Sequence, residues 1–196
     1  AADPELNGIT AHSGECQPGM AFVAARGAKA DGHHFVEHAF SKGATVAVVS
    51  DAEALCGRPG LVVEDTRKAL SALASFFAGA PSRDMTCIAV TGTNGKTTIH
   101  WLVHYLFAAL GRKSIRLGTL GTFCEGVIDR KEGLTTPDPV RLHADLALAR
   151  EHGADSAVME TSSHALHQER VSDVSFDAGI FTNLTRDHLD YHGDMT

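Results

Sequence analysis

One short segment constrains this chain more than any other, because Val90-Thr-Gly-Thr-Asn-Gly-Lys-Thr-Thr98 joins an apolar strand to an amphipathic helix. The run at 86–90 before it has the apolar, β-branched composition of a buried strand. After it, apolar side chains recur at the three- and four-residue steps of one helix face: Trp101, Leu102, Tyr105, Leu106 and Ala109. A strand, a glycine-rich turn and a helix in this order predict an α/β domain with an anion-binding turn.

The residue types in this turn suit a phosphate group. Glycines at 92 and 95 let the backbone wrap closely around phosphate oxygens, which a Cβ would obstruct. Lys96 reaches the terminal phosphates, and the Thr97 hydroxyl can bind magnesium. The strict pattern G-x-x-x-x-G-K-[ST] is not met, because its first position here is Val90. The strand before the turn and the helix after it still favour phosphate binding, by Gly92, Thr93, Asn94, Gly95, Lys96, Thr97 and Thr98.

Segments with strand and helix patterns alternate along the chain and predict an α/β fold, with a mainly parallel sheet covered by helices on both faces. Strands are expected at 45–50, 61–64 (buried), 86–90, 113–117, 156–159 and 177–182, with a small hairpin at 123–128. Helices are expected around 35–40, from a Thr66 cap to Phe77, after the glycine turn, from an Asp138–Pro139 start to about His152, and at 163–169. Gly79–Ser82 interrupts the pattern, so we expect one domain over residues 1–84 and a second over 85–196.

Charge and apolar content exclude several classes of protein. The 196 residues carry a formal net charge of -7, and acidic residues outnumber basic ones in both halves. No basic face can be built from that balance, so nucleic acid is not expected as a partner. No apolar run approaches the ~18 residues of a membrane span, and the N-terminus lacks the pattern of a signal peptide. We therefore expect no membrane partner and a cytoplasmic location; we also expect a monomer.

Two further groups bear on metal binding. Glu160 ends a strand, and because the carboxyl ends of parallel strands face the ligand crevice, it is placed to hold magnesium. The alternative for Glu160 is a solvated acid at a strand end. His188 and His192 are four residues apart and could form one side of a zinc site, although no third ligand follows at a suitable spacing. The four cysteines contain no C-x-x-C pair, which leaves reduced thiols as the simplest interpretation.

Three motifs together resemble a known family: Gly92-Thr-Asn-Gly-Lys-Thr-Thr98, Thr135-Thr-Pro-Asp138, and Met159-Glu-Thr-Ser-Ser-His-Ala-Leu-His-Gln-Glu-Arg170 with Phe181-Thr-Asn-Leu-Thr-Arg-Asp-His-Leu-Asp-Tyr-His-Gly193. They look like the Mur ligases, and specifically the MurE-type ligases, which add the third amino acid to UDP-N-acetylmuramoyl-L-alanyl-D-glutamate. Pro18-Gly-Met-Ala-Phe-Val23 and Ala30-Asp-Gly-His-His-Phe35 resemble, more loosely, the family's uridine-nucleotide-binding domain. The resemblance implies that residues 1–84 bind the UDP-muramoyl substrate and that residues 85–196 form the first part of a central ATP-binding domain.

The resemblance also implies a reaction in peptidoglycan precursor synthesis. ATP phosphorylates the substrate carboxylate, and the amino group of diaminopimelate or lysine attacks the acyl phosphate. The implied catalytic residues are Lys96, Glu160 and His188, and the implied Mg²⁺ ligands are Thr97, Glu160 and His188. The implied substrate-binding residues are Ser13, Thr135, Thr136, Ser162, Gln168 and Arg170, the last through a bidentate fork to a carboxylate or phosphate.

The chain departs from the family pattern in two ways. The family usually carries Asp-Ser-Arg where this chain has His12-Ser13-Gly14, so a cation that could offset diphosphate charge is missing. The family's carbamylated lysine is expected shortly beyond Thr196, so this chain is expected to be a truncated form, inactive alone. Two other hypotheses stay open: a nucleotide-binding module without catalysis, and another amide ligase such as a folylpolyglutamate synthetase.

Overall fold

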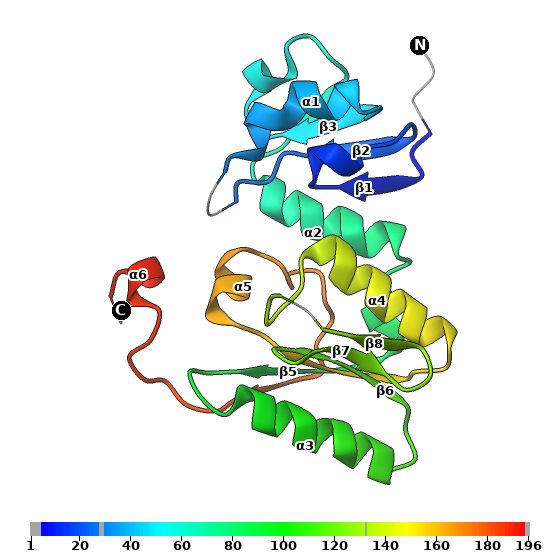
Figure 1. Ribbon diagram of the computed structural model, residues 1–196, viewed down its shortest axis with the longest axis vertical. Coiled ribbons are helices and arrows are strands. Elements are labelled where there is room, and N and C mark those ends of the chain that lie inside the picture. The colour runs from blue at the N-terminus through cyan, green and yellow to red at the C-terminus, as the bar shows by residue number, and fades with distance from the viewer. Residues whose placement is uncertain (1–4, 28–29, 132, 195–196) are drawn as a thin grey trace. The chain divides into compact units, whose positions relative to one another are not determined.

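The computed structural model describes residues 5–27, 30–131 and 133–194, and the chain divides into two compact units, Ala1–Gly79 and Ala80–Thr196. Each unit is a sheet with helices packed against it (Figure 1). The expectation about a signal peptide rests partly on residues 1–4, which lie outside the described residues. None of the helices in the described ranges has the length and apolar content needed to span a bilayer.

The first unit contains a four-stranded parallel sheet in the order β1-β2-β3-β4. Its elements are β1 (Gly8–Thr10), η1 (Ser13–Glu15), β2 (Met20–Val23), η2 (Gly32–Phe35), α1 (Val36–Ser41), β3 (Val46–Val49), η3 (Ala52–Leu55), β4 (Gly60–Val62) and α2 (Thr66–Phe77). Phe22 and Val49 pack with Val36 of α1 in one core cluster. Helix α2 contacts β1, β2 and β3, and Figure 1 places it on the sheet face opposite α1.

Two expectations for the first unit were wrong. Strand β4 forms, but it is not buried: Leu61 is 62% exposed and Val62 is 56% exposed, because β4 lies at the sheet edge and pairs only with β3. The N-cap of α2 is Asp65 rather than Thr66. The Asp65 carboxylate accepts from the Arg67 and Lys68 amides, while Thr66 is already the first helical residue.

The second unit contains a six-stranded sheet in the order β10-β5-β9-β6-β7-β8. Its elements are η4 (Pro81–Asp84), β5 (Thr86–Thr91), α3 (Lys96–Ala109), β6 (Ser114–Gly118), β7 (Gly121–Cys124), β8 (Ile128–Arg130), α4 (Pro139–Glu151), β9 (Ser156–Glu160), α5 (Ser163–His167), β10 (Ala178–Phe181) and α6 (Leu189–His192). The strands β10, β5, β9 and β6 are parallel, and β7 and β8 extend the sheet as an antiparallel hairpin.

Helices cover both faces of this second sheet (Figure 1). Val103 and Phe107 of α3 pack against Val158 on one face. On the other face, Leu142 and Leu146 of α4 belong to a larger cluster with residues of β5, β6 and β9. The predicted α/β class, with a parallel sheet in the first unit and a mainly parallel sheet in the second, is confirmed.

Candidate active site

The glycine-rich turn connects β5 to α3 and folds around the Lys96 side chain. Gly92 and Gly95 take the positive φ angles of 125° and 84° that favour glycine. The Lys96 ammonium donates to the carbonyl oxygens of Gly92 at 2.6 Å and Thr93 at 2.9 Å. The cation is therefore held directly over the turn that the sequence assigns to phosphate.

The turn also packs closely against the segment that follows β10. A Cβ built at Gly92 would lie 2.2 Å from Thr182 Oγ1, so only glycine fits there. The Thr93 amide donates to the Asn183 carbonyl at 2.9 Å, and the Asn94 amide donates to Asn183 Oδ1 at 3.1 Å. These two amides, which we expected to face phosphate, are thus bonded within the protein.

The first turn of α3 offers backbone donors instead. The first hydrogen bond of this helix runs from the Ile99 amide to the Gly95 carbonyl. The amides of Lys96, Thr97 and Thr98 precede that bond, and such N–H groups have no partner within their own helix. They lie at the positive end of the helix dipole, where an anion is stabilised.

Glu160 lies at the end of β9 and is fully buried. Its Oε2 accepts from the Thr97 hydroxyl at 3.0 Å and from the Thr119 hydroxyl at 3.0 Å. Its Oε1 accepts from the Thr119 amide at 3.1 Å. Gly118 makes room for this carboxylate, because a Cβ there would stand 2.3 Å from Oε1.

His100 approaches the same carboxylate from α3. Its Nδ1 lies 3.5 Å from Glu160 Oε1, and the ring is buried. Burial, followed by the charges of Arg116 and His104, lowers the pKa of His100 to about 4. The ring is therefore neutral near pH 7, and it faces Glu160 as a dipole rather than as a cation.

The chemistry of the donor set fits magnesium. A threonine hydroxyl and a carboxylate are hard oxygen ligands of the kind that Mg²⁺ takes when it also binds phosphate. Within residues 5–27, 30–131 and 133–194, no group of three or more His, Cys, Asp or Glu side chains could hold a metal ion. Within the described residues, the zinc alternative at His188 and His192 therefore gains no third His, Cys, Asp or Glu ligand.

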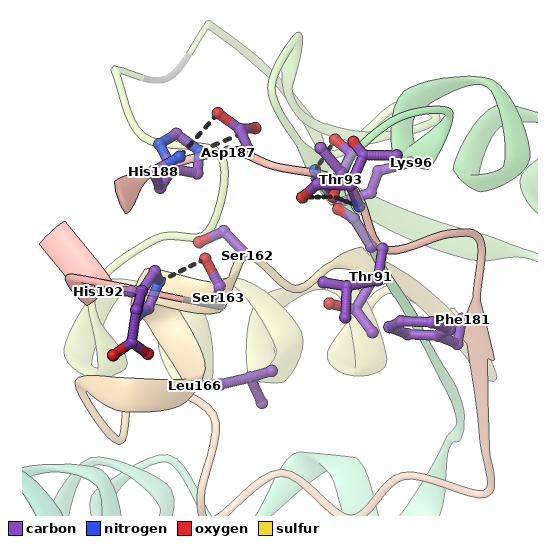
Figure 2. Close-up of a pocket in the computed structure, with 14 residues that line it drawn as sticks. Thr91, Thr93, Lys96, Ser162, Ser163, Leu166, Phe181, Asp187, His188 and His192 are labelled. Carbon is purple, nitrogen blue, oxygen red and sulfur yellow. Dashed lines mark hydrogen bonds and ion pairs between the residues drawn. The ribbon is translucent and has the colours of Figure 1, made fainter. Parts of the chain in front are cut away.

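His188 instead lines a cavity of about 500 Å³ between the turn and the C-terminal segment (Figure 2). Lys96 and Thr93 lie on one side of this cavity in Figure 2, and His192, bonded to Ser163, lies on another. The His188 ring nitrogen Nε2 lies 3.5 Å from Asp187 Oδ2. The cavity thus borders the glycine-rich turn, the expected Mg²⁺ ligand His188 and also His192.

Three residues expected to bind substrate meet beside Glu160. The hydroxyls of Thr119 and Thr135 lie 3.2 Å apart. The Thr136 hydroxyl donates to the Glu160 carbonyl at 2.8 Å and accepts from the Ser162 amide at 3.1 Å. Hydrogen bonds thus join the Thr135–Thr136 segment to both the side chain and the main chain of Glu160.

Gln168 and Arg170 extend this network. The Arg170 guanidinium donates to the Thr136 carbonyl through Nη1 at 2.8 Å and to Gln168 Oε1 through Nε at 3.0 Å. Gln168 in turn donates to the Tyr191 hydroxyl at 3.1 Å. Arg170 is therefore held by the protein itself.

Ser13 belongs to the other unit, in η1, where its hydroxyl lies 2.9 Å from His38 Nδ1. Sequence reasoning missed Gly118, Thr119 and His100. Two signals could have found them: Gly118 and Thr119 stand at the carboxyl end of a predicted strand, and His100 follows Lys96 by one helical turn.

Two family models match the chain, one in each half. Residues 90–196 match the Mur ligase middle domain, and residues 5–78 match the domain described as Mur ligase family, catalytic domain. The UDP-N-acetylmuramoyl-L-alanyl-D-glutamate--2,6-diaminopimelate ligase of Xylella fastidiosa (strain 9a5c) is 45% identical over 201 residues, covering 100% of this chain and 40% of that protein. The ligase of the same name from Parabacteroides distasonis is 43% identical over 194 residues, covering 98% of this chain and 40% of its own length.

A solved structure of a ligase with this name superposes with a TM-score of 0.81 at 28% identity, covering 96% of this chain and 38% of that one. The chain spans about 40% of the length of the curated relatives that it matches. The middle-domain match alone covers more than half of the 196 residues. On these matches, the chain belongs to the Mur ligase family.

Proposed function

We propose that the complete gene product is an ATP-dependent ligase that joins an amino acid to UDP-N-acetylmuramoyl-L-alanyl-D-glutamate. The observation that carries this proposal is the 3.0 Å contact between the Thr97 hydroxyl, in the first turn of α3, and Glu160, at the carboxyl end of β9. This contact lies beside the glycine-rich turn, whose carbonyl oxygens hold the Lys96 ammonium. This juxtaposition suits a magnesium nucleotide. The relatives' names supply the acceptor and favour 2,6-diaminopimelate as the added amino acid.

The proposed reaction has two steps. A carboxylate oxygen of the dipeptide substrate attacks the γ-phosphorus of ATP, and the bond to ADP breaks. The amine nitrogen then attacks the acyl carbon, the carbon–oxygen bond to phosphate breaks, and the nitrogen loses a proton. Because ATP and a UDP-linked substrate are both consumed, we place the reaction in the cytoplasm.

In this proposal the residues of the second unit have distinct roles. Lys96 and the first-turn amides of α3 stabilise the charge of the transferred phosphoryl group. Thr97 and Glu160 hold Mg²⁺, which neutralises phosphate charge when bound, and His188 lies across the cavity from Lys96. Thr135, Thr136, Ser162, Gln168 and Arg170 contact the UDP-muramoyl peptide.

We assign the two domains as residues 1–84 for the UDP-muramoyl substrate, with Ser13 among its contacts, and 85–196 for the first part of the ATP-binding domain. The matches at 5–78 and 90–196 support a boundary between these ranges. The nucleotide turn and Glu160 both fall in the second range.

The test is a ligation assay on the complete gene product, with ADP release and amide product measured together. Both signals should require the UDP-muramoyl dipeptide and diaminopimelate, with lysine and a folate substrate as comparison arms. Lys96→Met should lower kcat by about 100-fold, the loss typical when one charge-stabilising donor is removed. Product formation on folate, or nucleotide binding without any ligation, would overturn the proposal.

A further inference from the structure

Thr119 lies between Glu160, a proposed Mg²⁺ ligand, and Thr135, a proposed substrate-binding residue. It follows β6 directly and contacts Glu160 twice, through its amide at 3.1 Å and its hydroxyl at 3.0 Å. The same hydroxyl lies 3.2 Å from the Thr135 hydroxyl. The Thr119 hydroxyl thus contacts both the Glu160 carboxylate and Thr135.

The direction of these hydrogen bonds follows from the inventory of protons. A carboxylate only accepts, whereas a hydroxyl has one proton to donate and two lone pairs. The Thr119 hydroxyl therefore donates its single proton to Glu160. In the contact between the two hydroxyls, Thr135 must then be the donor and Thr119 the acceptor. With its proton used in this way, Thr135 faces any ligand as an acceptor.

We propose that Thr119 is a positioning residue that fixes the Glu160 carboxylate and presets Thr135 to accept a hydrogen bond from the substrate. This inference rests on the proposed function. It assigns to Thr135 a ligand N–H or O–H, such as a peptide amide or a sugar hydroxyl, rather than a phosphate or carboxylate oxygen. The Thr119 hydroxyl would then affect both the position of the Glu160 carboxylate and substrate recognition by Thr135.

The experiment uses the complete gene product and the variants Thr119→Val, Thr119→Ser and Thr135→Val. Thr119→Val keeps the hydrogen bond from the residue 119 backbone amide to Glu160 and removes the hydroxyl. It should weaken ATP binding by about 10-fold in the presence of Mg²⁺ and far less in its absence, as expected for the loss of one hydrogen bond to a charged group. Thr119→Ser should restore binding to within about 2-fold, because the hydroxyl returns.

The link to the substrate is tested through the KM for UDP-N-acetylmuramoyl-L-alanyl-D-glutamate. Thr135→Val should raise this KM by about 5-fold while leaving Mg²⁺-dependent ATP binding unchanged, a loss within the range for one neutral hydrogen bond. The double variant with Thr119→Val should raise the KM no further than the larger single effect, since residues in one network are not additive. Thr135→Val remains informative even if Thr119→Val is too unstable to assay.

A matched control is Thr161→Val. Thr161 follows Glu160 and its buried hydroxyl has no hydrogen-bond partner in the described structure, so the same atoms change without breaking a bond. This variant should bind ATP as the parent does. Wild-type behaviour of Thr119→Val, or additive effects in the double variant, would overturn the positioning role. A parent protein without Mg²⁺-dependent ATP binding would overturn the proposed function itself.

Discussion

Gly118 stands so close to Glu160 that a Cβ on it would lie 2.3 Å from Oε1 and 2.9 Å from Cδ of that side chain. Gly118 is in strand β6 and does not have a positive φ, so the restriction is one of space and not of backbone conformation. On one side, strand β6 pairs with β9, which ends at Glu160. The absence of a side chain at Gly118 therefore leaves the space that the Glu160 carboxylate occupies.

Gly118→Ala should move the Glu160 carboxylate and leave the fold intact. The clash is with a side chain that can rotate, so the loss in unfolding free energy should stay below about 2 kcal/mol. Separation of Glu160 from Thr97 should weaken magnesium-dependent ATP binding by about 10-fold or more. Titration with a fluorescent ATP analogue at several Mg²⁺ concentrations measures this. Gly179→Ala, in strand β10 with open space at the Cβ, is the control and should bind as the parent does.

Gly92→Ala should damage both stability and nucleotide binding, because the new Cβ would meet Thr182 Oγ1 at 2.2 Å and the Asn183 backbone at 2.7 Å. Gly95→Ala meets nothing within 4 Å and has only its positive φ to accommodate. That strain is worth about 1 kcal/mol. Urea unfolding of both variants should give a loss at least twice as large for Gly92→Ala. Equal losses would argue against the packing of the turn on the segment after β10.

His143 should make the protein less stable in mild acid. It is fully buried in α4 with neither ring nitrogen hydrogen-bonded, and burial lowers its pKa from 6.5 to about 4, against the opposing charge of Asp173. Between these two values the unfolded chain binds more protons than the folded chain, so the free energy of unfolding falls as the pH falls. From pH 8 to pH 5 this one group accounts for about 2 kcal/mol.

His143→Leu tests this directly. The variant should lose about 2 kcal/mol less than the parent between pH 8 and pH 5, measured by denaturant unfolding at each pH. Each protein is compared with its own unfolding free energy at pH 8, so a constant change in stability caused by repacking around residue 143 cancels. Parallel profiles for the two proteins would show that His143 does not cause the acid sensitivity.

Asp65→Ala should cost about 1 kcal/mol of unfolding free energy, the usual loss when a helix loses its N-cap oxygen. The carboxylate accepts from the Arg67 and Lys68 amides at the start of α2. Asp65→Ser keeps an acceptor and should retain most of that stability. Thermal or urea unfolding of the two variants tests this. Equal losses for Asp65→Ala and Asp65→Ser would indicate that Asp65 acts through its charge and not as a helix N-cap.

The elements that the sequence predicted well are those with strong local signals. The strand ending at Val90, the turn and helix α3 follow from apolar periodicity and glycines, and Asp138–Pro139 indeed begins α4, with the Asp138 carboxylate accepting from the Arg141 amide. The strand that ends at Glu160 is also as expected. Each of these depends on residues within one turn or one strand of each other.

What could not be predicted depends on partners distant in sequence. Strands β1 and β2 are short and carry no long alternating pattern, so they form because β2 pairs with β3 and β1 pairs with β2. The exposure of β4 follows from the strand order, which local composition does not encode. The capture of the Thr93 and Asn94 amides by Asn183 requires β10 to pair with β5.

Arg170 is fixed by the folded chain before any ligand arrives, through Gln168 and the Thr136 carbonyl. An unrestrained arginine gives up rotamer freedom when it docks, at about 0.5–1.5 kcal/mol for each immobilised side chain. Here that entropy is lost when the domain folds. In the proposed function, an anionic substrate would meet a positive charge at a constant position. Preorganisation of this kind would slow dissociation of the substrate more than it would speed association.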